Sequence, residues 1–304
     1  GYRINNDPTK LYTGKVTNIY IEGTNIFLGT ANGGIWRNIF ITWGCLSDRL
    51  PTQQIGALAV KPGTDNVILA GTGELFNGGG SGFGLFKTTD GGLNWTMKNM
   101  TGSLEPSGFS RLAFSRQGSD TVHAATDLGY FRSTNQGETW TRFNIDLNPQ
   151  RVISDLRIDP LNSRILYSVV NRDGVGGGGI YKSTNAGMNW VKAGGIPDSN
   201  GNGAISICES FNQIMFSYLT NANTAGALGI YRSTNSGQNW SILNVPQNFL
   251  DALGTQGFHA YACTVSPTNP NIILVGGVKL IRTSNGGLNW NTVGDIHDDI
   301  QNFE

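Results

Sequence analysis

Charge of one sign, cysteine and long apolar runs are all scarce in this sequence. The 21 basic and 21 acidic residues among 304 cancel to a net charge of zero. The chain therefore lacks the long-range attraction to phosphate on which nucleic-acid-binding proteins depend. No run approaches the roughly 20 apolar residues that a transmembrane helix needs. The three cysteines, Cys45, Cys208 and Cys263, cannot all pair and show no metal-ligand spacing.

Glycine and aromatic side chains are, by contrast, abundant. The chain has 43 Gly, 14 Phe, 9 Tyr and 7 Trp, and its hydrophobic content of 38% is too high for a disordered protein. Only 10 Pro accompany the glycines, and no Gly-X-Y period is present, which excludes collagen. The composition indicates a globular protein with many turns and little helix.

One short segment recurs five times without gaps and ends each time in tryptophan. The copies are residues 84–95, 129–140, 179–190, 229–240 and 279–290. The closing tryptophans, Trp95, Trp140, Trp190, Trp240 and Trp290, are 45, 50, 50 and 50 residues apart. A sixth, degenerate copy at 34–43 lacks the central turn residues. Ordered matches at such a period indicate a repeat architecture.

Each copy predicts a β-hairpin. Its first half alternates with a period of two, as a half-buried strand does. An Asp or Asn follows, whose side chain can bond backbone amides ahead of it, and then a Gly that tolerates positive φ. A Ser or Thr two positions before the Asx can add a second side-chain bond. We expect the five Asx residues to be structural, because Asn at four of them keeps the turn bonding without a charge. They are Asp90, Asn135, Asn185, Asn235 and Asn285.

The rest of each unit predicts two more strands, and the whole unit is then four antiparallel strands in about 50 residues. Alignment of Pro62, Pro160 and Pro267 superimposes the apolar positions of these strands. Four-stranded units of this period arranged around an axis form a β-propeller. We therefore predict an all-β fold, a single propeller domain over residues 1–304 with six or seven blades.

The expected blade boundaries follow from the repeat. They are approximately residues 13–50, 53–101, 108–146, 152–197, 203–246 and 258–295. Residues 297–304 resemble the start of another first strand. Either they close the first blade as a clasp, or they begin a further blade of a larger propeller.

The repeat resembles a known family. The Thr-x-Asp-x-Gly-x-Asn-Trp run at 88–95 is similar to the Asp-box, or BNR, repeat of sialidases, xyloglucanase-type glycoside hydrolases, sortilin-type receptors and photosystem II assembly factors. The longer phrases at 14–36 and 55–95 look most like BNR proteins that Bacteroidota export by type IX secretion. The resemblance covers residues from about 13 to 295 and implies a secreted or cell-surface propeller. It is specific for the fold and leaves the function open.

Binding residues are expected on one face of the ring. In a propeller the first strand of each blade lines the axis, and the loops between second and third strands share a face with the interblade connections. The long Gly-rich loops at 73–84, 171–179 and 221–229 are candidates, because loops on a rigid scaffold commonly carry binding. Simple solvated linkers are the alternative. The candidate binding residues are Glu74, Phe76, Asn77, Phe83, Arg172, Asp173 and Phe258, with Phe109, Tyr218 and Phe249 as further aromatic contacts.

Catalytic motifs are missing. Glycoside hydrolysis needs two carboxylates roughly 5 to 9.5 Å apart, and four can lie on the loop face: Glu74, Asp127, Asp173 and Asp251. No motif fixes any of them. The resemblance implies an Asp before the Gly-Gly of the first blade in xyloglucanase-type enzymes, and Asn32 stands there. The sialidase entry motif is matched only by a fragment at 2–5.

A calcium pattern is also present. Residues 198–209 match the EF-hand loop, with Asp198, Asn200, Asn202 and Glu209 at ligand positions. An extended strand over 204–209 would carry Glu209 roughly 20 Å from the loop. We therefore expect a plain interblade turn, with Ca²⁺ at Asp198, Asn200 and Asn202 as the alternative and no other cofactor.

The sequence thus predicts a non-catalytic, secreted or cell-surface propeller that acts as a rigid binding or structural module for a protein or a glycan. Further domains of the same polypeptide are possible partners, whereas nucleic acid and a membrane span are not expected. The alternative is a glycoside hydrolase, xyloglucanase-like or sialidase-like, that uses Glu74 and Asp173 as acid and base. A third interpretation, an assembly factor for a membrane complex, would call for a charged patch of one sign, which the neutral composition does not suggest.

Overall fold

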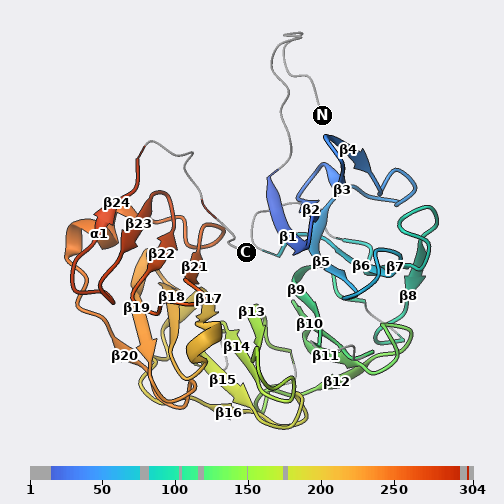
Figure 1. Ribbon diagram of the computed structural model, residues 1–304. Coiled ribbons are helices and arrows are strands. Elements are labelled where there is room, and N and C mark those ends of the chain that lie inside the picture. The colour runs from blue at the N-terminus through green and yellow to red at the C-terminus, as the bar shows by residue number, and fades with distance from the viewer. Residues whose placement is uncertain are drawn as a thin grey trace.

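The chain forms a β-propeller of six blades around one axis (Figure 1). The structure, a computed structural model, describes residues 15–75, 82–102, 105–115, 120–148, 150–173, 177–294 and 300. Each blade is a sheet of four antiparallel strands in which neighbours in sequence are neighbours in the sheet. The first strand of each blade is innermost and the fourth is outermost (Figure 1). The predicted all-β propeller is confirmed.

The strands of the six blades have the following bounds. Blade 1 comprises β1 (Val16–Glu22), β2 (Asn25–Thr30), β3 (Gly34–Ile39) and β4 (Thr42–Cys45). Blade 2 comprises β5 (Ile55–Val60), β6 (Ile68–Thr72), β7 (Leu85–Thr88) and β8 (Thr96–Lys98). Blade 3 comprises β9 (Phe109–Phe114), β10 (Val122–Thr126), β11 (Gly129–Ser133) and β12 (Thr141–Phe143).

The remaining blades follow the same order. Blade 4 comprises β13 (Ile153–Ile158), β14 (Leu166–Val170), β15 (Gly179–Ser183) and β16 (Val191–Lys192). Blade 5 comprises β17 (Asn200–Ile207), β18 (Met215–Asn221), β19 (Ala227–Ser233) and β20 (Ser241–Ile242). Blade 6 comprises β21 (Ala262–Val265), β22 (Ile273–Gly276), β23 (Leu280–Thr283) and β24 (Asn291–Thr292). The helices are short: η1 (Glu209–Phe211) and α1 (Gln247–Ala252). In the described ranges no helix could cross a membrane.

The turn between third and fourth strands has the same hydrogen bonds in blades 2 to 6. We call it the box turn; it spans residues 88–92, 133–137, 183–187, 233–237 and 283–287. Its Ser or Thr hydroxyl donates to the Asx Oδ1 at 2.7–3.0 Å and accepts the Gly N–H at 2.8–3.1 Å. The Asx Oδ1 also accepts the N–H four residues ahead at 2.9–3.0 Å. The predicted turn bonding is therefore confirmed for Asn as well as for Asp.

The residue after the Asx is left-handed in every box turn, and in three of them it is not glycine. Ala186 has φ of 59°, whereas Gly91 holds the same place in blade 2 with φ of 71°. A left-handed L-residue costs about 1–2 kcal/mol, part of which the extra freedom of glycine in the unfolded chain offsets. We expect Ala186→Gly to raise the free energy of unfolding by about 0.5–1 kcal/mol in urea titrations. Gly91→Ala should lower the free energy of unfolding by a similar amount, although its added Cβ lies no closer than 3.7 Å to any atom. If both substitutions change the free energy of unfolding in the same direction, this explanation is wrong.

Five apolar clusters fill the spaces between consecutive blades. Each cluster includes the tryptophan that lies three residues after the box turn of the later blade, which we call the box-turn tryptophan. Trp95 thus packs against blade 1 and Trp290 against blade 5. The last glycine of each box turn also faces the preceding blade, where an added Cβ would lie 2.0–3.0 Å from a side chain. These contacts pair Gly92 with Leu46, Gly137 with Leu69, Gly187 with Tyr130, Gly237 with Tyr167, and Gly287 with Leu243. The repeated motif therefore joins blades as well as turning the chain.

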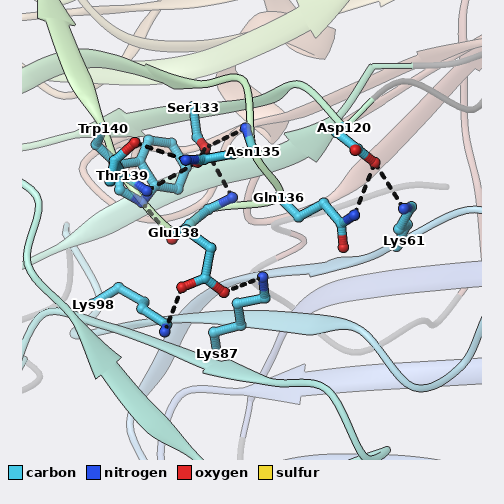
Figure 2. Close-up of polar contacts among 11 residues, drawn as sticks. Lys61, Lys87, Lys98, Asp120, Ser133, Asn135, Gln136, Glu138, Thr139 and Trp140 are labelled. Carbon is cyan, nitrogen blue, oxygen red and sulfur yellow. Dashed lines mark hydrogen bonds and ion pairs between the residues drawn. The ribbon is translucent and has the colours of Figure 1, made fainter.

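A basic residue on the third strand adds a polar link to the next blade. Figure 2 shows this link between blades 2 and 3, where Lys87 of the third strand and Lys98 of the fourth contact Glu138, the residue after the box turn, at 2.6 and 2.8 Å. In the next two blades the acceptors are backbone carbonyls. Arg132 donates to Ala186 O at 2.8 Å, and Lys182 donates to the corresponding carbonyl of blade 5 at 2.6 Å. Arg132 is one of four arginines at this repeated position, and its bond agrees with a structural role.

The Glu138 link should contribute measurably to stability. Lys87 is only 4% exposed, and its ammonium group has Glu138 as its acceptor. The hydrogen bonds from Lys87 and Lys98 hold the pKa of Glu138 below its ordinary value. Because Glu138 itself is 46% exposed, we expect Glu138→Ala to cost only about 1 kcal/mol in the free energy of unfolding. An unchanged urea midpoint would contradict this link.

Candidate binding site on the propeller axis

A polar cavity opens on the axis where the first strands of all six blades meet. Its volume is about 70 Å³. Each first strand contributes to the lining, which confirms the prediction that these strands surround the axis. The contributions are Thr17 from β1, Gly56 from β5, Phe109, Ser110 and Arg111 from β9, Ser154, Asp155 and Arg157 from β13, Ala204 from β17, and Ala262 and Cys263 from β21. Glu74, His259 and Tyr261 reach the same cavity from loops.

A carboxylate between two guanidinium groups lines this cavity. Asp155 accepts from Arg111 Nε at 3.3 Å and from Arg157 Nε at 3.1 Å. Its two oxygens also accept the backbone N–H groups of Leu156 and Ile205 at 2.9 and 2.8 Å. Burial alone would raise the pKa of Asp155, but the two guanidinium groups and a backbone N–H outweigh it, so this pKa lies below its ordinary value. Asp155 thus stays ionised and ties blades 3, 4 and 5 together.

The groups beside this carboxylate stay neutral at ordinary pH. Burial, followed by the charges of Asp155 and Glu74, raises the pKa of Tyr261 well above 10. Burial raises the pKa of the Cys263 thiol to about 12. Cys45, Cys208 and Cys263 are all free thiols, and the last two are buried. The cavity can therefore offer hydroxyl, guanidinium and carboxylate groups, but no thiolate nucleophile.

Only one of the two candidate catalytic carboxylates reaches the cavity. Glu74 lines it and forms an ion pair with Lys15. Asp173 lies in the second-to-third-strand loop of blade 4, where it pairs with Arg151 at 3.1 Å and accepts from Asn148 Nδ2 at 2.9 Å. Arg151 is 1% exposed, which makes Asp173 the partner of a buried charge. Each carboxylate is thus held in its own ion pair on a different blade.

The other predicted binding residues have varied surroundings. Phe258 is 49% exposed and packs edge-on against the cavity residue His259, and Phe83 is 55% exposed. Arg172 is exposed and donates to Asn223 Oδ1 of the neighbouring blade at 3.3 Å. Phe76 and Asn77 lie outside the described residues.

Two of the further aromatic candidates are buried; Phe109 still lines the axial cavity, whereas Tyr218 was wrong as a surface contact. Phe109 and Tyr218 are 1% and 0% exposed. Both belong to interblade apolar clusters, and Phe249 packs on one of these from the side. Phe109 begins β9 and Tyr218 lies within β18, so the fold places both in its core and not in a loop.

The other two loop-face carboxylates are also accounted for. Asp127 accepts the backbone N–H of Ser107 at 3.1 Å. Asp251 is exposed on α1 and accepts from Gln247 Nε2 at 2.8 Å.

The EF-hand-like residues lie at the start of blade 5. Asp198 forms an ion pair with Lys192. The amide of Asn200 donates to Val170 O at 3.1 Å, and that of Asn202 to Phe258 O at 2.9 Å. Glu209 begins η1. Across the described residues no group of three or more His, Cys, Asp or Glu side chains could hold a metal ion, and the calcium alternative stays a prediction.

Sequence reasoning missed the central charged group. Arg111, Asp155 and Arg157 lie on first strands of two blades and are brought together only by the ring. One signal was available, because charged residues interrupt apolar strands at places where blade 2 has Ala57 and Ala59.

The comparisons with known proteins support the fold. No protein-family model and no curated protein matches the sequence. Among solved structures, an ancestral GH74 enzyme is 20% identical with a TM-score of 0.68 over 92% of this chain and 38% of its own. The GH74 xyloglucanase of Xanthomonas campestris is 16% identical with a TM-score of 0.55 over 90% and 52%. YCF48 bound to D1 peptide is 16% identical with a TM-score of 0.60 over 92% and 81%.

These similarities define the fold class of the chain, a β-propeller, and do not define its function. This chain spans about half or less of the two GH74 structures. At such identities the likeness shows that the chain has the same kind of propeller fold as glycoside hydrolases and as a peptide-bound protein.

Proposed function

We propose that this protein is a non-catalytic binding module that presents the axial cavity and its surrounding loops to a segment of protein or glycan. The observation that carries the proposal is that each candidate catalytic carboxylate is held in an ion pair and the two do not share the cavity. Glu74 is paired with Lys15, Asp173 is paired with Arg151, and only the former reaches the cavity. A glycosidase needs one of its two carboxyl groups protonated and both beside the same bond.

The surface around the cavity suits recognition. Phe258 and Phe83 supply half-exposed aromatic faces, and Arg172 supplies a cation, which are groups that commonly anchor ligands. The peptide bound to YCF48 and the xyloglucanase activity of the Xanthomonas enzyme give precedents for both ligand classes on this fold. The resemblance of residues 14–36 and 55–95 to exported BNR proteins supports an extracellular setting, including type IX secretion, as part of the same proposal.

A paired assay tests this function. Xyloglucan, β-glucan and sialosides are incubated with the protein and with Glu74→Gln, and the release of reducing sugar is measured. We expect no release from either, since neither acid is arranged for catalysis. Turnover that disappears in Glu74→Gln would establish the hydrolase instead.

Binding is measured in parallel on arrays of glycans and of extended peptides. Phe258→Ala and Arg172→Ala should each lower the affinity for the ligand found on the arrays by about tenfold. Arg164→Ala serves as the control, because Arg164 is equally exposed but lies beside the box turn of blade 4, away from the loop face. Equal losses in all three variants would contradict a site on the loop face.

A further inference from the structure

The two end blades leave a seam in the ring. Figure 1 shows blade 1 in blue and blade 6 in red on either side of a break. The five apolar clusters join blades 1–2, 2–3, 3–4, 4–5 and 5–6. In the described part of the chain, none of these clusters joins blade 6 to blade 1. We call the two facing flanks of blades 1 and 6 the seam.

The blade 1 side of the seam is an apolar sheet face that is partly exposed to solvent. Strand register makes Ile19, Ile21 and Trp36 the counterparts of Leu58, Val60 and Phe86 in blade 2. The blade 2 residues are 1–7% exposed because they pack against blade 1. Their blade 1 counterparts are not buried, and Ile21 is 55% exposed.

The tryptophan of blade 1 shows the same exposure. Trp43 is 47% exposed and belongs to none of the five clusters. The five box-turn tryptophans each belong to one.

The blade 6 side is uncovered as well. In each blade, one residue of the second strand pairs with the basic residue of the third strand. This second-strand residue is 0% exposed in the first five blades, where it is Phe27, Leu69, His123, Tyr167 and Phe216. In blade 6 this position is Leu274, which is only half-buried. Arg282, the basic residue opposite it, is exposed, whereas its counterparts in the other blades are half-buried or buried.

Blade 1 is not built to receive Arg282. Its β3–β4 turn has Phe40 and Ile41 in place of the Asn and Gly of a box turn, and these are 97% and 99% exposed. The path of the chain points to a different neighbour. Ile300 N donates to Gly277 O at 2.8 Å, just after β22. Phe109 N, at the start of blade 3, donates in the same way to Gly73 O, just after β6, at 3.1 Å.

We propose that the seam takes one further four-stranded blade with a box turn, and that the polypeptide enters this blade at Ile300. The box turn of that blade receives Arg282 and packs its last glycine and its tryptophan on the flank of blade 6. The outgoing flank of the same blade covers Ile21, Trp36 and Trp43. The occupant is inferred from continuity with five interfaces of one design.

A graft of the chain's own repeat tests the seam. A second copy of blade 2, residues 53–101, is appended after residue 300. Melting temperature and tryptophan emission are then compared with those of the 304-residue chain. We expect a rise of at least about 5 °C and a blue shift of emission, since Trp36 and Trp43 leave water. Ile21→Asp should abolish both gains, whereas Leu161→Asp, at a residue 64% exposed in blade 4, should keep them.

A second experiment uses the ungrafted chain and therefore does not depend on whether the graft folds. With an open seam, Ile21→Asp and Leu161→Asp should each change the melting temperature of the 304-residue chain by less than about 2 °C. A large loss from Ile21→Asp alone would show that the seam is already filled. If sedimentation then shows a dimer that Ile21→Asp dissociates, a second copy is the occupant and the proposal is overturned. A graft that folds without either gain would also overturn it.

Discussion

Replacing Gly187 with alanine is expected to lower the free energy of unfolding by about 3–4 kcal/mol. Gly187 has φ of 80°, and a Cβ at this position would lie 2.0 Å from the hydroxyl oxygen of Tyr130. Tyr130 cannot easily retreat, because it is 0% exposed and its hydroxyl contacts His123 Nδ1 at 2.6 Å. Urea denaturation followed by tryptophan fluorescence measures the loss.

A matched glycine separates the clash from backbone strain. Gly63 has φ of 81°, and its added Cβ meets no atom within 4 Å. Gly63→Ala should therefore cost only about 1 kcal/mol, which is the strain common to both positions. If the two variants lose equal stability, the box-turn glycine does not hold blades 3 and 4 together.

Replacing Asp155 with asparagine is expected to cost about 3–5 kcal/mol, since it leaves two half-buried guanidinium groups without their shared carboxylate. Asp155 is 4% exposed and accepts from two guanidinium groups and two backbone N–H groups. Asp251→Asn is the control. Asp251 is exposed on α1 and accepts only from Gln247 among the described contacts, so its substitution should stay within about 0.5 kcal/mol.

The same carboxylate gives stability a defined pH dependence. Its pKa in the folded protein lies below the ordinary value of 3.8. A lowered pKa contributes stability that is fully present above the unfolded value and is lost as the pH falls through the folded value. The wild type should therefore lose stability below about pH 3.8 more steeply than Asp155→Asn. Parallel profiles for the two proteins would contradict the assignment of this loss to Asp155.

The parts of the fold that repeat were predictable, and the contacts made only once were not. Tryptophan spacing and Asx-Gly turns identified the blades, because each blade must solve the same turn and packing problem. The site depends on Arg111, Asp155 and Glu74 meeting across blades, and no periodicity reports which first-strand residues face one another on the axis. Tyr218 was misplaced for a related reason, since periodicity does not report that its strand continues past it toward the loop at 221–229.

The acceptors of the interblade links differ from one pair of blades to the next, and so the joints of the ring should respond differently to acid. Between blades 2 and 3 the acceptors are the carboxylates of Glu138 and Asp120, the latter 2.8 Å from Lys61 (Figure 2). Between blades 3 and 4, and again between blades 4 and 5, the acceptors are peptide carbonyls, which do not titrate. The third-strand link between blades 2 and 3 should therefore weaken as Glu138 takes up a proton, whereas the corresponding links of the next two pairs of blades should not.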